Sequence, residues 1–309
     1  MERQVILNAD DFGLTRGVNA GIVRAYLAGG VTSASLMVNM PGFGDAVRLA
    51  RALPGLGVGL HFNLTYGRPL SDPKKVPSLV TPDGAFLDGK IPRVRAAADV
   101  ARELEAQWSR FAKTDLSPTH LDSHQLLHQT DPVIYMVMAE KACRENVPLR
   151  RSQVVHPLPN LPQPRMTDTI LLDTYGDDEG LQRLRQHLRS LPEGIAEIMC
   201  HPGCVDDALR EISAWTDIRE RELKVFASRE VSQALRELGI VPVNYRMVRD
   251  RPAPADIPLP VRPAAKAQPV HRRRSAKGRS ADGPGGKLPP QKRSRLSRRH
   301  GVQNRRWNS

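Results

Sequence analysis

Carboxylate and imidazole side chains recur at four places in the chain, each in or directly after a predicted short strand. They are Asp10 and Asp11 after VILNA, His61 after GVGL, the HLDSH string that ends at His124, and His201 after AEIMC. Taken singly, an acidic pair can cap a turn and a histidine can be a satisfied core residue. Four clusters at equivalent places instead favour one shared site, since carboxylates and imidazoles from separate strands commonly hold a divalent metal.

The residue types also suggest a reaction. A metal with two or three protein ligands keeps positions open, so it can lower the pKa of water and polarise a carbonyl. One of Asp10 and Asp11 can bind the metal while its neighbour accepts the water proton, because adjacent carboxylates in a turn point in different directions. His201 can protonate a leaving nitrogen or support an oxyanion. This combination predicts metal-assisted hydrolysis of an amide or ester.

Other reaction classes have weaker support. A single Cys200-x3-Cys204 pair is poor grounds for a zinc site, and packing of Cys200 in the core is the better interpretation. We expect His128 to support the site or begin a helix rather than bind metal. The sequence has no Gly-x-Gly-x-x-Gly, Walker-type or Gly-x-Ser-x-Gly motif, which disfavours dinucleotide, nucleotide triphosphate and serine hydrolase chemistry.

Alternating β-type runs and helical periods must position these residues. The expected strands cover residues 5–9, 34–39, 57–62, 119–122, 148–151, 169–172, 196–200 and 241–244. The expected helices cover residues 16–28, 43–52, 96–113, 132–145, 179–191, 213–226 and 229–238. This order predicts a largely parallel α/β fold, a distorted (β/α) barrel resembling a TIM barrel, with an open doubly wound sheet as the alternative. The carboxyl ends of parallel strands share one edge, so the four polar clusters should converge there.

Two long stretches interrupt the alternation, at residues 67–92 and 156–167. Both are rich in proline and polar residues. Long loops of this kind in a compact domain are commonly functional, and we expect these two to form walls of a substrate cleft.

The formal charge of +13 is unevenly distributed along the chain. Residues 262–309 carry 15 Lys and Arg against one acid, a net of +14, which leaves 31 basic and 32 acidic side chains, a net of −1, in residues 1–261. A near-neutral body excludes a nucleic-acid partner attracted by the charge of the whole domain. Residues 251–309 are proline-rich and then Arg/Lys-rich with little to bury, which predicts a disordered tail after one domain at residues 1–250.

Composition also bears on the compartment. The 3 cysteines are too few for a disulfide framework. The first residues lack the pattern of a secretory signal, and no run of about 18 apolar residues occurs. We therefore expect a soluble cytoplasmic protein without a membrane partner.

Four ordered strings resemble the YdjC-like family of carbohydrate deacetylases over about residues 1–250. They are NADDFGL at residues 8–14, GLHFNLT at 59–65, THLDSH at 119–124 and MCHP at 199–202. The resemblance implies a distorted (β/α) barrel, a homodimer, Mg²⁺ as cofactor and removal of acetyl groups from N-acetylated sugars such as chitooligosaccharides. Two imidazole ligands more often suit Zn²⁺ or another transition metal, so these ions are alternatives.

The resemblance also implies roles for single residues. Asp11, His61 and His124 match the metal ligands, and Asp10 matches the catalytic base, although the two aspartates could exchange roles. His201 matches a late histidine of the family, for which we infer an acid role. The chain departs from the family at residues 125–127, Gln-Leu-Leu, where members often continue as a histidine-rich run.

The leading hypothesis is therefore a metal-dependent hydrolase that removes the N-acetyl group of a small amino-sugar oligosaccharide. One alternative keeps this chemistry but places the substrate in hopanoid lipid biosynthesis. The other makes the protein a nucleic-acid or anionic-surface binder through its tail, with the barrel as a scaffold. Trp307 is the sole aromatic residue of the tail, so contact with such a partner would be nonspecific.

Overall fold

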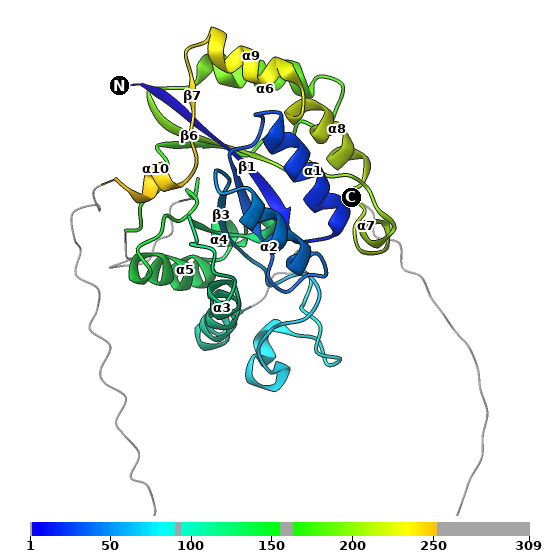
Figure 1. Ribbon diagram of the computed structural model, residues 1–309. Coiled ribbons are helices and arrows are strands. Elements are labelled where there is room, and N and C mark those ends of the chain that lie inside the picture. The colour runs from blue at the N-terminus through cyan, green and yellow to red at the C-terminus, as the bar shows by residue number, and fades with distance from the viewer. Residues whose placement is uncertain (1, 90–93, 155–162, 252–309) are drawn as a thin grey trace, which may run out of the picture. The chain divides into compact units, whose positions relative to one another are not determined.

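The computed structural model describes residues 2–89, 94–154 and 163–251. Within them, a parallel sheet curls into a half-barrel in the order β4-β3-β2-β1-β6-β5, and β7 also pairs with β1 (Figure 1). The strands are β1 (Arg3–Phe12), β2 (Ser33–Leu36), β3 (Gly57–Phe62), β4 (Leu121–Ser123), β5 (Thr169–Leu171), β6 (Gly194–Cys200) and β7 (Val241–Pro242). The predicted barrel-like α/β fold is confirmed.

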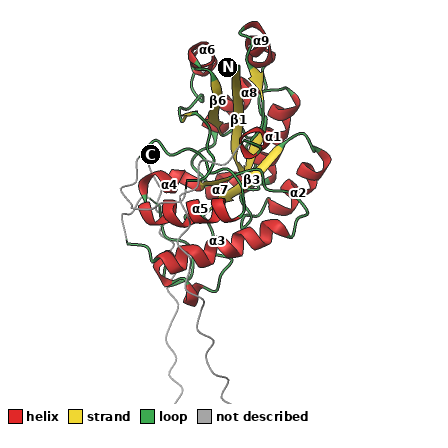
Figure 2. Ribbon diagram, turned by 90° about the vertical axis from the view of Figure 1, so that its left-hand side faces the viewer, coloured by secondary structure: helices red, strands yellow, loops and turns green. Residues whose placement is uncertain are grey.

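Helices cover the outside of the sheet. They are α1 (Arg16–Leu27), α2 (Phe43–Ala52), α3 (Ala97–Ala112), α4 (Leu127–Thr130), α5 (Pro132–Arg144), α6 (Gly180–Ser190), α7 (Asp207–Ile212), α8 (Asp217–Phe226), α9 (Arg229–Glu237) and α10 (Arg246–Arg249). The long helices α3 and α5 pack side by side against the half of the sheet that contains β3 and β4, and α6 packs against α8 and α9 at the other end (Figure 2).

The helices form where local sequence signals and an apolar face agree. Asp131 caps α5 by accepting hydrogen bonds from the backbone N–H groups of Val133 and Ile134, and Pro132 occupies the first turn. Helix α3 buries Val100, Leu104, Trp108 and Phe111 at the spacing of one helical face.

Strand β1 lies at the centre of the sheet and is buried on both faces from Val5 to Phe12. Burial of a parallel strand on both faces accounts for its continuous apolar start, VIL. Because β1 pairs with β2, β6 and β7, residues at its carboxyl end can be reached from both halves of the sheet.

The predicted strand at residues 148–151 is wrong. Leu149 forms only a single bridge to Leu121, and its own N–H donates to the carbonyl of Arg165 instead of a strand ladder. The segment is thus an edge contact rather than a strand.

The predicted helix at residues 213–226 is wrong in its first turn. Asp206 caps a separate short helix, α7, which ends at Ile212, the next residue Ser213 is extended, and α8 begins only at Asp217. Residues between α7 and α8 form a loop whose contacts matter for the site.

Parts of other predictions lie outside the described residues. Residues 67–89 of the first long loop are described and contain two short 3₁₀ turns, Pro73–Lys75 and Pro77–Leu79. Most of the second loop and all of the tail after residue 251 are outside the described ranges. Among the described helices, none combines the length and apolar character needed to cross a bilayer.

Candidate active site

Strand β1 carries Asp10 and Asp11 where its pairing with β2 becomes irregular. In a regular strand, neighbouring side chains point to opposite faces, so only one of the two acids would reach the site. Between Ala9 and Phe12 the register shifts, and Asp11 has a φ of 68°, in the left-handed region. A bulge of this kind redirects a side chain. Both aspartates consequently have a carboxylate oxygen within 4.8 Å of a ring nitrogen of His61.

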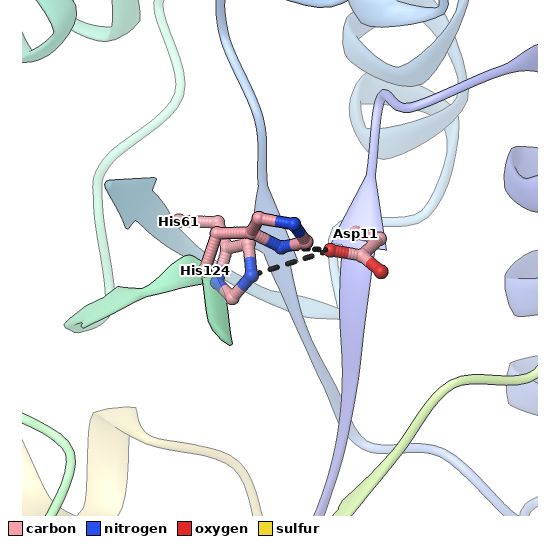
Figure 3. A group of neighbouring side chains, drawn as sticks. All are labelled: Asp11, His61 and His124. Atoms are coloured by element: carbon pink, nitrogen blue, oxygen red, sulfur yellow. Dashed lines mark hydrogen bonds and ion pairs between the residues drawn. The ribbon is translucent and has the colours of Figure 1, made fainter. Parts of the chain in front are cut away.

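The three predicted metal ligands come together at this point (Figure 3). The Oδ1 atom of Asp11 lies 3.3 Å from Nε2 of His61 on β3 and 3.0 Å from Nδ1 of His124, which follows β4. All three potential ligand atoms lie within 4.8 Å of one another. The geometry therefore places one carboxylate and two imidazoles around a common point.

A left-handed turn follows His124 immediately. Gln125 and Leu126 have φ values of 54° and 52°, a conformation that side chains of this kind rarely adopt. Backbone strain of this kind persists only where the surroundings determine it, often at functional sites. This turn includes Gln125 and Leu126 of the Gln-Leu-Leu segment that follows HLDSH in the sequence.

Asp122 orients the imidazole of His61. Its Oδ1 atom lies 2.7 Å from Nδ1 of His61, while Nε2 of His61 is buried and makes no hydrogen bond within the described residues. Burial lowers the pKa of His61, but the nearby Asp122 and Asp10 carboxylates outweigh it and raise that pKa to about 10. A carboxylate on one ring nitrogen, with the second nitrogen facing another potential ligand at 3.3 Å, is typical of a metal-binding histidine.

The donor set fits a divalent ion. The Nε2 atom of His61 is a buried polar atom without a hydrogen bond in the described chain, and it faces Asp11 Oδ1. Burial raises the pKa of Asp11, but Arg219 and His124 hold it well below its usual range, so Asp11 is charged as a ligand must be. Asp11, His61 and His124 would hold the ion.

Asp10 is held by a buried arginine that sequence reasoning did not identify. Arg150 donates to both oxygens of Asp10, from Nη1 to Oδ2 at 2.7 Å and from Nη2 to Oδ1 at 2.6 Å. The amide of Asn8 also donates to Oδ1 of Asp10, at 2.9 Å. A two-pronged arginine contact fixes a carboxylate in both position and orientation, so Asp10 has one defined pose beside the metal ligands.

Arg150 also neutralises two further buried carboxylates. It lies 2.9 Å from Oδ2 of Asp122 and 2.8 Å from Oε1 of Glu197, and its side chain is fully buried. The hydroxyl of Tyr245 donates to the other oxygen of Glu197. A charged residue inside a run predicted as a strand, 148–151, was the one sequence signal that could have revealed this role.

A second arginine, Arg219 on α8, holds the other oxygen of Asp11, one of the three candidate ligands. Its Nη2 atom lies 2.6 Å from Oδ2 of Asp11, opposite the oxygen that faces the histidines. This contact fixes which oxygen Asp11 presents to them. Sequence reasoning missed Arg219, because it belongs to a helix whose charged residues look like an ordinary solvated face.

His201 follows β6 and reaches the site from the side of Asp10. Its Nε2 atom lies 4.0 Å from Oδ2 of Asp10, and Nδ1 makes no hydrogen bond to the described residues. The backbone N–H of His201 donates to Glu222, a buried residue of α8. The site thus contains all five predicted residues: Asp10, Asp11, His61, His124 and His201. His128, by contrast, is bonded to Ser123 through Nδ1 at 2.6 Å.

Comparison with known proteins matches the chain to one family. The profile described as YdjC-like protein matches residues 4–237. The chain belongs to the YdjC-like family. Within that family it is 41% identical over 250 residues to a carbohydrate deacetylase of Geobacillus stearothermophilus, covering 80% of this chain and 98% of the relative. It is 39% identical over 257 residues to a chitooligosaccharide deacetylase of Salmonella schwarzengrund, covering 79% and 99%.

A solved structure has the same fold. It comes from Enterococcus faecalis V583 and is named as a candidate cellobiose-phosphate cleavage protein. It superimposes with a TM-score of 0.73 at 31% identity and covers 80% of this chain and 99% of that one. The similarity therefore extends over nearly the whole length of these relatives.

Proposed function

We propose that this YdjC-like protein hydrolyses the N-acetyl group of small amino-sugar oligosaccharides, releasing acetate and a free amine. The relatives named as carbohydrate and chitooligosaccharide deacetylases support the substrate class. The observation that carries the proposal is the convergence of Asp11, His61 and His124 beside a fixed Asp10. That arrangement supplies ligands for a divalent ion and a separate carboxylate for proton transfer.

A divalent ion held by Asp11, His61 and His124 would polarise the acetyl carbonyl and make a water molecule more acidic. We propose Mg²⁺ as the ion on the strength of the family resemblance. The two imidazoles suit Zn²⁺ or another transition metal better than Mg²⁺, so the assay must compare them.

Asp10 accepts the proton of the attacking water. Arg150 and Asn8 fix its carboxylate, so the accepting oxygen does not have to be positioned during the reaction. One oxygen of Asp11 faces the histidines and the other contacts Arg219. Asp10 is therefore the carboxylate that does not bind the ion in this proposal.

His201 protonates the departing amine nitrogen. Its Nε2 atom is 4.0 Å from Asp10 Oδ2, so the proposed proton donor and proton acceptor lie close together. Glu222 anchors the His201 backbone. Asp10 takes a proton from water and His201 gives a proton to the amine, and these two transfers complete amide hydrolysis.

Two substitutions test the roles. Asp10→Asn should retain the metal but lose most acetate release from N,N′-diacetylchitobiose, a drop of about 10² to 10⁴-fold, whereas His61→Ala should lose the metal itself. Metal content by atomic absorption and acetate release by a coupled assay measure the two properties. Undiminished turnover by Asp10→Asn would remove Asp10 from the mechanism.

Acetate release should be measured on a panel of acetylated sugars after chelation and readdition of Mg²⁺, Zn²⁺ and other single ions. Activity on amino sugars supports the proposal, while activity only on a lipid-linked amide would move the substrate to hopanoid biosynthesis. We also propose a cytoplasmic homodimer, in keeping with three free cysteines and the family resemblance. Sedimentation at equilibrium checks the dimer.

The basic tail is proposed to make nonspecific contacts with an anionic partner. The support is its net charge of +14 over residues 262–309. Deletion of residues 262–309 should leave deacetylation intact and remove salt-sensitive DNA binding. If the full chain binds no DNA at low salt, the tail has no such role.

A further inference from the structure

Trp215 lies against the proposed acid and is partly open to solvent. It belongs to the loop between α7 and α8, and 42% of its surface is exposed. Its ring centroid is 5.4 Å from that of His201, with the two planes at 81°. A large aromatic face is therefore available at the edge of the site.

The loop that carries Trp215 lies near the opposite side of the site. The backbone N–H of Trp215 donates to Oγ of Ser213 at 3.0 Å. Burial raises the pKa of Tyr66, and the nearby Ser213 side chain opposes that rise. Tyr66 packs its ring edge-on against His124, with centroids 5.7 Å apart. Two aromatic rings from distant parts of the chain thus flank the metal-ligand side and the acid side.

Packing of the core does not account for this position. Trp215 is absent from both groups of packed core side chains among the described residues. By comparison, Trp108 is 8% exposed and packs in the core beneath the ammonium of Lys141. An indole that gains little from burial yet is held by its backbone beside a reaction centre has the features of a ligand-binding surface.

We propose that Trp215 is the platform on which a pyranose ring of the substrate stacks. The carbon-bound hydrogens of a pyranose face carry partial positive charge, and the face of an indole is electron-rich. Stacking there places a sugar ring next to His201, the residue proposed to protonate the sugar nitrogen. Trp215 therefore selects acetamido sugars over acyl amides without a ring. This inference rests on the proposed function.

Kinetics on N,N′-diacetylchitobiose provide the first test. Trp215→Ala should raise KM about tenfold with a smaller change in kcat, and Trp215→Phe, which keeps an aromatic face, should recover most of the affinity. Met247→Ala is the matched control, because Met247 is also an exposed apolar side chain, at 45%, but lies on α10. It should behave as the unmodified protein does.

Direct binding provides the second test and separates this inference from the proposed function. In a full-length Asp10→Asn protein with Trp108→Phe and Trp307→Phe, all indole fluorescence comes from Trp215. N,N′-diacetylchitobiose should change that fluorescence saturably, and acetamide should leave it unchanged.

Three combinations of results separate the stacking role of Trp215 from the deacetylase function. If the unmodified protein releases acetate but Trp215→Ala keeps its KM and the indole does not respond, the stacking role is overturned and the deacetylase function stands. If no acetylated sugar is hydrolysed but the indole responds saturably to the sugar, the sugar platform stands and the proposed function falls. If neither is seen, both are overturned.

Discussion

Replacement of Arg150 by methionine tests whether the buried charges under the site are balanced by one guanidinium. Arg150 is fully buried and lies within 2.9 Å of carboxylate oxygens on Asp10, Asp122 and Glu197. Methionine has a similar length and no charge, so Arg150→Met leaves three carboxylates in the interior without their cation. Breaking a buried ion pair costs about 3–5 kcal/mol.

The expected destabilisation is large enough to measure by thermal unfolding. For a domain of this size, 1 kcal/mol corresponds to about 2–4 °C in Tm, so Arg150→Met should lower Tm by about 6–20 °C at pH 7. Arg151→Met is the matched control, since the Arg151 guanidinium is only partly buried and its Nε donates to the backbone carbonyl of Thr167. The control should unfold within about 3 °C of the unmodified protein.

The pH dependence gives a second and independent readout. Burial raises the pKa of Asp122, but Arg150 and His61 hold it well below its usual range. A depressed pKa contributes stability above the unfolded value and loses it on acidification. Without Arg150, burial dominates, and the pKa values of the buried carboxylates in the folded state rise above their unfolded values. The loss of stability caused by Arg150→Met therefore grows as pH rises from about 4 to 7.

In metal-free protein, the Tm difference between Arg150→Met and the unmodified protein should therefore become smaller as pH is lowered from 7 to 5. Adding Glu197→Gln to the Arg150→Met protein should recover part of the stability at pH 7, since one buried charge is removed. Equal Tm values for the Arg150 and Arg151 variants, or a deficit independent of pH, would refute the charge-balance reasoning.

Three further outcomes follow from single residues. A Cβ on Gly59 would lie 2.4 Å from the buried ring of His120, so Gly59→Ala should cost about 1–3 kcal/mol in urea unfolding, whereas Gly44→Ala, with nothing within 4 Å, should not destabilise. Burial is the main cause that lowers the pKa of His120 to about 3. The neutral imidazole therefore stabilises the fold fully above about pH 6.5, and this stabilisation is lost as pH falls towards 3. In His120→Asn, the free energy of unfolding should depend less steeply on pH over this range. The pKa of His61 is about 10 despite burial, so metal-free protein should lose stability as pH rises from about 6.5 to 10, and binding of a divalent ion at pH 8 should release a proton detectable with an indicator dye.

The convergence of the candidate ligands could be predicted from sequence, because local composition indicates where strands end. His61 and Asp11 follow apolar runs whose limits local composition reveals, and parallel strands end at a common edge. For the same reason β3 (Gly57–Phe62) and α2 (Phe43–Ala52) occur at the predicted residues.

The supporting charges could not be predicted in the same way. Arg150 becomes important only because the fold brings Asp10, Asp122 and Glu197 around it, from positions up to 140 residues away. Arg219 gains its role from the placement of α8 beside β1, which no local pattern encodes. Pairing across the fold, rather than local propensity, determines these contacts.

The division between α7 and α8 also escaped prediction. Residues 213–226 have an acceptable helical period, but Asp206 supplies a separate helix start and Ser213 is extended. The helical period of residues 213–226 therefore predicts a first turn that the extended backbone at Ser213 replaces with a loop.

The irregular pairing of β1 has a consequence for anyone who wishes to transplant the chemistry. Asp10 and Asp11 share one side of the sheet only because Asp11 takes a φ of 68°. If the five side chains were copied into another barrel with a regular strand in place of β1, one of the two aspartates would point to the opposite face of the sheet. The backbone kink is thus part of the minimal graft, and a donor segment of β1 has to be transferred together with its mismatch to β2.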